Sequence, residues 1–140
     1  MIKTSATKVS EIKRDWHFFD VKSKILGRVS TDIAKKLMGK NKPYFVPFLD
    51  CGDYVVVVNC AQIEVTGKKM EQKVYRHYSG YPGGQKKKFM KQVMAEHPEL
   101  VIRQAVSGML PKNKLRDSML RRLYIYPNDD HPYKAKFIKS

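Results

Sequence analysis

Residues 77 to 88 form the stretch with the clearest capacity for chemistry, because they read HYSGYPGGQKKK. Glycines allow a backbone to approach a phosphate closely, and lysines neutralise its charge. Such a segment suits either a nucleotide that reacts or a nucleic acid that is only held. A phosphate-binding loop of the GxxxxGKS or GxxxxGKT type needs a different spacing and a hydroxyl group for magnesium. Neither is present, which favours holding over hydrolysis.

Motifs for other enzyme chemistry are missing from the sequence. A dinucleotide site would need GxGxxG after a strand, but only Gly27 follows the first expected strand, and no GxSxG nucleophile turn occurs. Asp50 and Asp53 could work as paired carboxylates, although a polar turn leading into the next strand is the favoured interpretation. The histidines and cysteines lack the spacing of a zinc site: His17, His77, His97, His131, Cys51 and Cys60. We therefore expect no catalytic residue, metal, cofactor or small-molecule substrate.

The basic residues are numerous and segregated. The 140 residues contain 28 Lys and Arg against 13 Asp and Glu, a net charge of +15. Three segments, residues 35–42, 68–91 and 112–122, hold 17 of these basic residues and only 2 of the acids. A surface that is merely solvated mixes the two signs, so this segregation predicts a polyanionic partner, nucleic acid in the first place. A membrane surface is the weaker alternative, because no apolar run approaches the roughly 18 residues that span a bilayer.

Aromatic residues lie among the basic residues of the segment 68–91. They are Tyr75, His77, Tyr78 and Tyr81. Aromatic rings can stack on unpaired RNA bases. Alternation along a strand places Tyr75 and His77 on one face and Tyr78 on the other, so we expect one of these faces to belong to the core.

Hydrophobic spacing predicts one α/β domain over residues 1–140. The run YVVVVN at residues 54–59 is apolar without alternation, which is typical of a central strand in a parallel sheet. Residues 26–37 carry apolar side chains at helical spacing, with Ser23 as a possible N-cap and Gly39 as a stop. Residues 1–15 are expected to form a loose basic arm, and residues 127–140 an irregular basic tail. The other expected elements are strands at 16–21, 63–65, 73–79 and 122–126, and helices at 87–95, from Pro98, and after Asn113.

Several motifs occur in the order of one known family. They are RDWHFFD, LGRVSTDIAKKLMGK, DCGDYVVVVN with IEVTGKK, YRHYSGYPGG, and AVSGMLPKNKLRDSMLRRLYIY. Together they resemble the bacterial form of the universal large-subunit ribosomal protein thirteen, from about Trp16 to Asn128. The resemblance implies a three-layer α/β/α fold around a small, mostly parallel central sheet. It implies a structural role in the large ribosomal subunit and in its early assembly, with no enzyme activity.

The resemblance also implies partners and a location. The expected partners are large-subunit ribosomal RNA and neighbouring large-subunit ribosomal proteins, with no membrane partner and no homo-oligomer. The expected location is the cytoplasm, within the large subunit, with an organellar ribosome left open. A free RNA-binding protein outside the ribosome is the alternative function.

The candidate RNA contacts come from the basic segments and the glycine loop. Lys86, Lys87 and Lys88 are expected at a helix start, where the helix dipole favours a nearby phosphate. Arg121 and Arg122 are both expected at the surface of a basic helix. The full set is Arg28, Lys35, Lys36, Lys40, Lys42, Lys68, Lys69, Tyr81, Gly83, Gly84, Lys86, Lys87, Lys88, Lys112, Lys114, Arg116, Arg121 and Arg122.

Overall fold

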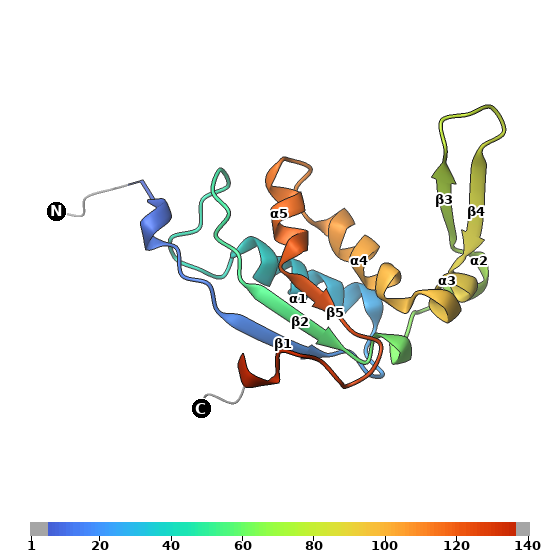
Figure 1. Cartoon of the computed structure of the whole chain (residues 1–140), viewed down its shortest axis with the longest axis horizontal. Helices are drawn as coiled ribbons and strands as arrows, with labels where there is room; N and C mark the ends of the chain where they lie inside the picture. Colours follow the sequence, from blue (N-terminus) through green and yellow to red (C-terminus); the bar gives the residue numbers. More distant parts are fainter. Residues whose placement is uncertain (1–5, 137–140) are drawn as a thin grey trace.

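A parallel sheet of three strands forms the centre of the protein (Figure 1). The computed structural model describes residues 6–136, so residues 1–5 of the expected arm and 137–140 of the expected tail lie outside it. The strands β1 (Trp16–Asp20), β2 (Tyr54–Val58) and β5 (Leu123–Ile125) lie in the order β1-β2-β5, and both pairings are parallel. The predicted α/β class with a mostly parallel central sheet is confirmed.

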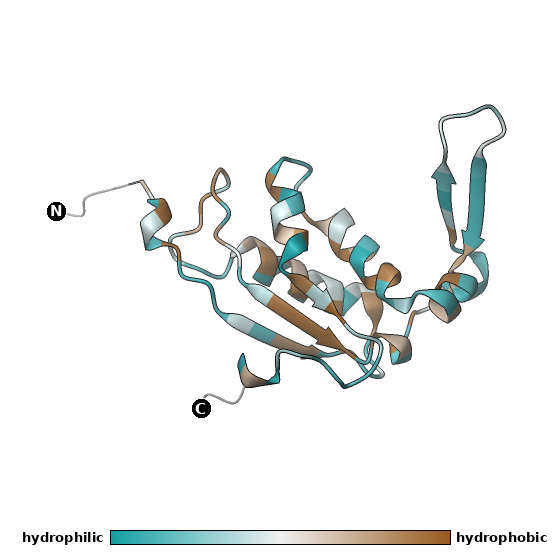
Figure 2. Cartoon of the chain, in the orientation of Figure 1, coloured by the Kyte–Doolittle hydropathy of each residue, from teal (hydrophilic) through white to brown (hydrophobic). Residues whose placement is uncertain are grey.

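Strand β2 occupies the centre of this sheet, as its apolar run predicted. Its residues Val55 to Val58 are each 0% exposed. Val55 and Val57 belong to the main core cluster, together with Leu123 of the neighbouring strand. Full burial of each valine contributes about 1.5–3 kcal/mol, so this one strand is a large part of the core. Figure 2 shows the strand as the most hydrophobic part of the sheet.

Two helices, α1 (Leu26–Met38) and α4 (Pro98–Met109), pack against each other on one face of the sheet. Helix α1 ends at Gly39, which takes φ 80°, and α4 begins at Pro98; both boundaries are as predicted. The predicted N-cap Ser23 is wrong. Ser23 lies in a turn at φ 59°, its N–H donates to the Gln62 carbonyl, and Ile25 precedes the first residue of the helix.

Aromatic side chains cover the opposite face of the sheet. Trp16 stacks on Tyr54 with ring centroids 4.5 Å apart, and Tyr133 lies 5.1 Å from Trp16 at a tilted angle. Tyr133 comes from the segment that follows β5 and contains the short 3-10 helix η3 (Lys134–Lys136). Within the described residues, this C-terminal segment is therefore the layer that faces the sheet on the side away from α1 and α4 (Figure 1).

A second, smaller sheet stands apart from the first (Figure 1). Its strands β3 (Val74–Tyr78) and β4 (Gln85–Phe89) form an antiparallel hairpin between the helices α2 (Lys69–Gln72) and α3 (Met90–Glu96). The strand expected at 73–79 therefore exists but belongs to this hairpin. The strand expected at 63–65 is wrong, because only an isolated bridge pairs Ile25 with Glu64.

The helix expected at 87–95 begins later than predicted. Lys86, Lys87 and Lys88 lie on β4, and α3 starts at Met90. Three consecutive lysines have no apolar face to bury in a helix, whereas β3 offers them a complete antiparallel register, with Arg76 opposite Lys87. The interpretation that these lysines sit at a helix start is therefore wrong.

Short elements and side-chain contacts complete the fold. The 3-10 helices η1 (Val9–Glu11) and η2 (Cys60–Gln62) lie in loops, and α5 (Leu115–Arg121) follows Asn113. Lys114 directly precedes α5, and Asn113 Oδ1 accepts a hydrogen bond from the Leu115 N–H at 3.1 Å. The described part of the N-terminal arm is not loose. Thr7 Oγ1 donates to the Tyr44 carbonyl at 2.8 Å, and the Lys13 N–H donates to the Tyr44 hydroxyl at 3.1 Å.

Candidate nucleic-acid interface

The β3–β4 hairpin carries positive charge that is compensated at only one of its basic side chains among the described residues. Arg76, Lys86, Lys87 and Lys88 are all exposed, and no acidic residue occurs between residues 74 and 89. Arg76 lies directly opposite Lys87 in the register, an arrangement of like charges that destabilises a strand pair. Within residues 6–136, the one ion pair that these four side chains form joins Lys88 Nζ to Glu96 at 2.9 Å. The hairpin therefore presents a surface that a polyanion would stabilise.

The end of β3 and the loop that follows it, residues 79–84, present aromatic rings. Tyr78 is 63% exposed and Tyr81 is 75% exposed, so both rings are free to stack on a partner.

The expectation that one face of strand β3 belongs to the core is correct only near the base of the hairpin. Tyr75 packs against the core, and its burial raises the pKa of its hydroxyl. His77 and Tyr78 are exposed because the hairpin stands off from the domain.

The shape of the loop 79–84 explains why glycine occupies positions 83 and 84. Gly83 takes φ +72°, a conformation that side chains with a Cβ rarely adopt. A Cβ at Gly84 would lie 1.9 Å from Ser79 Oγ, and the Ser79 N–H already donates to the Gly84 carbonyl. These glycines are needed for the shape of the loop, whether or not a backbone phosphate also approaches it.

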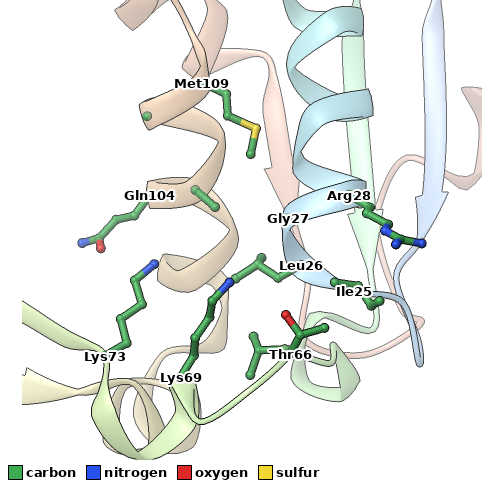
Figure 3. A pocket seen from close by; sticks show the side chains of 12 residues that line it. Ile25, Leu26, Gly27, Arg28, Thr66, Lys69, Lys73, Gln104 and Met109 are labelled. Atoms are coloured by element: carbon green, nitrogen blue, oxygen red, sulfur yellow. The ribbon is translucent and has the colours of Figure 1, made fainter.

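A cavity lies at the foot of the hairpin, between α1, α4 and the segment 65–73 (Figure 3). It has a volume of about 580 Å³. Lys69 and Lys73 extend into it from α2 and its C-terminal end, while Arg28 lies at the rim and points away (Figure 3). The fold thus brings together Arg28 and Lys69, which were predicted separately from two distant segments. Lys73 and Gln104 complete this group; both were missing from the predicted set.

A second basic region lies at the other end of α1. Lys35 is exposed and Lys36 half-buried in the last helical turn, and Lys40 follows Gly39. Lys40 and Asn113 line one groove of about 320 Å³, so the end of α1 lies beside the start of α5. The remaining predicted residues of this region lie on α5 or before it, where all but the half-buried Arg116 are exposed: Lys112, Lys114, Arg116 and Arg121.

Arg122 differs from its neighbour Arg121, because it is buried. The Arg122 side chain is 9% exposed, and its guanidinium forms an ion pair with both carboxylate oxygens of Asp50. It also donates to the backbone carbonyls of Asp53 at 3.3 Å and Leu37 at 3.1 Å. The prediction that Arg122 lies at the surface is therefore wrong. All of its donors face protein acceptors, and its role is to join β5 to the loop before β2.

Asp53 is the centre of a neighbouring buried network. Its carboxylate is 1% exposed and accepts from Lys42 Nζ at 2.5 Å and from His17 Nε2 at 2.7 Å. Burial acts to raise the pKa of this carboxyl, but the hydrogen bonds from Lys42, His17 and the Asp15 N–H outweigh burial and hold the pKa below its ordinary value. The two acids thus do more than form a polar turn: Asp50 and Asp53 anchor basic residues internally. The charge of Lys42 is neutralised by Asp53 inside the protein, and the Lys42 side chain is only 9% exposed.

Groups that could support other functions are sparse in residues 6–136. Among these residues, no cluster of three or more His, Cys, Asp or Glu could hold a metal ion. Within the same part of the chain, no helix has the length and apolar character needed to cross a membrane. Cys51 and Cys60 are buried free thiols, and burial raises the pKa of Cys60 to about 12.

Comparison with known proteins agrees with the order of motifs in the sequence. Residues 14–132 match the family described as Ribosomal protein L13. A protein named large ribosomal subunit protein uL13 from Roseiflexus sp. (strain RS-1) is 50% identical over 135 residues, 96% of this chain and 92% of the relative. Its namesake from Geobacter sp. (strain M21) is 48% identical over 139 residues, 99% and 98% of the two chains. That from Thermotoga petrophila is 48% identical over 134 residues, 96% and 90%. The chain therefore belongs to the ribosomal protein L13 family, as its motifs predicted.

Proposed function

We propose that this protein is a structural constituent of the large ribosomal subunit that binds large-subunit ribosomal RNA and takes part in early subunit assembly. Its relatives carry the name large ribosomal subunit protein, and the family is structural and non-enzymatic. The proposed partners are large-subunit ribosomal RNA and neighbouring ribosomal proteins. The proposed location is the ribosome of the cytoplasm.

The observation that carries the RNA-binding part of this proposal is the largely uncompensated charge of the β3–β4 hairpin. Like charges face each other across its two strands, and its exposed tyrosines lie beside them. Phosphates would neutralise the lysines, and unpaired bases could stack on the rings. The second basic region, around the end of α1 and α5, would contact a separate part of the RNA. Arg122 and Lys42 are excluded from the proposed contacts because their charges are used internally.

The proposal is tested by following incorporation into ribosomal particles. The test variant carries Lys86→Glu and Lys87→Glu, and the matched control carries Lys22→Glu and Lys24→Glu. All four lysines are exposed, and both variants change the net charge equally, but Lys22 and Lys24 lie on the turn between β1 and α1. Each tagged protein is expressed in cells and located by sucrose-gradient sedimentation at low salt.

We expect the wild type and the control to sediment with large subunits and their precursors, and the hairpin variant to shift to the free pool. Wild type that is mostly free would contradict the ribosomal role and support an RNA-binding protein outside the ribosome. Equal incorporation of both variants would show that the hairpin lysines are only solvated.

A further inference from the structure

The cavity at the foot of the hairpin has two kinds of wall (Figure 3). Leu26, Ala105 and Met109 supply an apolar wall from α1 and α4, and Lys69 and Lys73 supply amino groups from the opposite side. No carboxylate occurs among the described residues that line it. A volume of about 580 Å³ falls within the range of about 300–1,000 Å³ that is usual for small-molecule sites.

The two lysines lack counter-charges of their own. Lys69 and Lys73 are four positions apart along one short helical turn, where like charges repel. Neither forms an ion pair with an acidic residue in the described part of the chain, although Lys73 Nζ lies 5.5 Å from the centre of the Tyr75 ring. An anionic group in the cavity would remove this repulsion. Gln104 also lines the cavity, and its amide carries both donors and an acceptor.

Two glycines keep the cavity open. Gly27 in α1 and Gly108 in α4 both line it, and a Cβ at either position would meet no atom within 4 Å. Neither glycine has a positive φ. Glycine inside a helix is destabilising relative to alanine, and no contact within the described structure requires it here. Both positions therefore border open space, which a long side chain would occupy and a single methyl group would not.

We propose that this cavity receives one unpaired nucleotide of the bound RNA, with its base against the apolar wall and its phosphate at Lys69 and Lys73. A base with its phosphate combines the apolar face and the negative charge that these walls match, whereas a phosphate alone would leave the apolar wall uncovered. This inference rests on the proposed RNA-binding function and deepens it. It goes beyond backbone contact, because an unpaired base gives local specificity.

The test fills the cavity from either wall. Gly108→Leu and Gly27→Leu place side chains in the open space, and Gly108→Ala is the matched control that adds only a methyl group. Since both positions are helical, each variant should melt at or above the wild-type temperature, which separates filling from unfolding. Affinity for purified large-subunit ribosomal RNA is measured by filter binding over a range of salt concentrations. Ultraviolet cross-links are located by mass spectrometry.

We expect the wild type to cross-link to RNA within residues 65–73 or 104–109. Gly108→Leu and Gly27→Leu should lose this cross-link and bind about tenfold or more weakly, as for loss of one stacked base. Their salt dependence should become only slightly weaker, because at most the contact of one phosphate with Lys69 and Lys73 is lost while the other basic contacts remain. Gly108→Ala should bind almost as the wild type does.

Other outcomes would overturn the assignment. Wild-type affinity and an intact cross-link in both leucine variants would show that no nucleotide enters. Normal RNA binding combined with loss from subunits would assign the cavity to a neighbouring protein instead. If the wild type bound no RNA at all, both the proposed function and this nucleotide site would be refuted. If the wild type bound RNA and the leucine variants bound it equally well, only the nucleotide site would be refuted.

Discussion

The clearest quantitative prediction concerns Arg122 and its neighbour Arg121. Arg122→Met removes an ion pair with Asp50, whose side chain is only 14% exposed, and leaves the carbonyls of Leu37 and Asp53 without this donor. Breaking a buried ion pair by removing one partner costs about 3–5 kcal/mol. We take the lower end, about 3 kcal/mol, because Arg14 Nη1 remains 3.8 Å from Asp50 and compensates part of its charge.

This loss is large relative to the stability of a small domain, about 5–15 kcal/mol. With a urea dependence of about 1.5 kcal/mol per molar, the unfolding midpoint should fall by about 2 M. The assay is urea denaturation of the purified protein, followed by circular dichroism. Arg121→Met is the matched control, because Arg121 is exposed and a surface substitution changes stability by about 0.5 kcal/mol or less.

The two arginines should therefore separate stability from RNA binding. Arg121→Glu should fold normally and weaken incorporation, whereas Arg122→Glu should unfold, because it places a carboxylate beside Asp50. An Arg122→Met protein within about 1 kcal/mol of the wild type would refute the reasoning, since it would show that the buried pair contributes no more than a surface pair does.

Three further outcomes are expected. Lys86→Glu with Lys87→Glu should lower the slope of log affinity against log salt for RNA by more than Lys22→Glu with Lys24→Glu; equal slopes in filter binding would argue against hairpin contact. Because the folded-state pKa of Asp53 lies below its unfolded value, its network stabilises the fold above about pH 4 and is lost as the pH falls through the folded value. Urea midpoints at pH 5 and pH 3 should therefore differ, and less so in Asp53→Asn. Gly52→Ala should destabilise strongly in the same assay, since a Cβ there would lie 1.6 Å from the Leu37 carbonyl oxygen; a wild-type midpoint would contradict this packing.

Local sequence signals predicted the central sheet and its helices well. The four valines of β2, the stop at Gly39 and the start at Pro98 each depend on residues close in sequence, so a short window contains the information. The hairpin was only half predicted. The segment from Lys87 to Ala95 is compatible with a helix when it is taken alone, and only the pairing of Lys86–Lys88 with β3 across the loop makes it a strand.

The sequence showed which residues are basic, but it did not show which of them are buried against acidic partners. Arg121 and Arg122 are adjacent and equivalent in the sequence, and the partner that buries Arg122 lies 72 positions away. Lys42 and Asp53 are closer in sequence but are joined by an irregular loop whose course the sequence does not reveal. Burial of a long basic side chain depends on such distant partners, so no local pattern could have distinguished these residues from exposed lysines.

The fold divides its basic residues between two roles by the placement of a few acids. Asp50 and Asp53 lie in the loop before β2, where they neutralise Arg122, Lys42 and Arg14 and so hold the arm, α1 and β5 around the sheet. The hairpin contains no acid, and a two-stranded hairpin alone is only marginally stable in water. Its stability therefore depends on its base, where Tyr75 and Met90 join the core, and the proposed RNA partner would add to it by neutralising the outer part. The acids near the sheet thus leave most of the hairpin's charge free for the RNA partner that we propose.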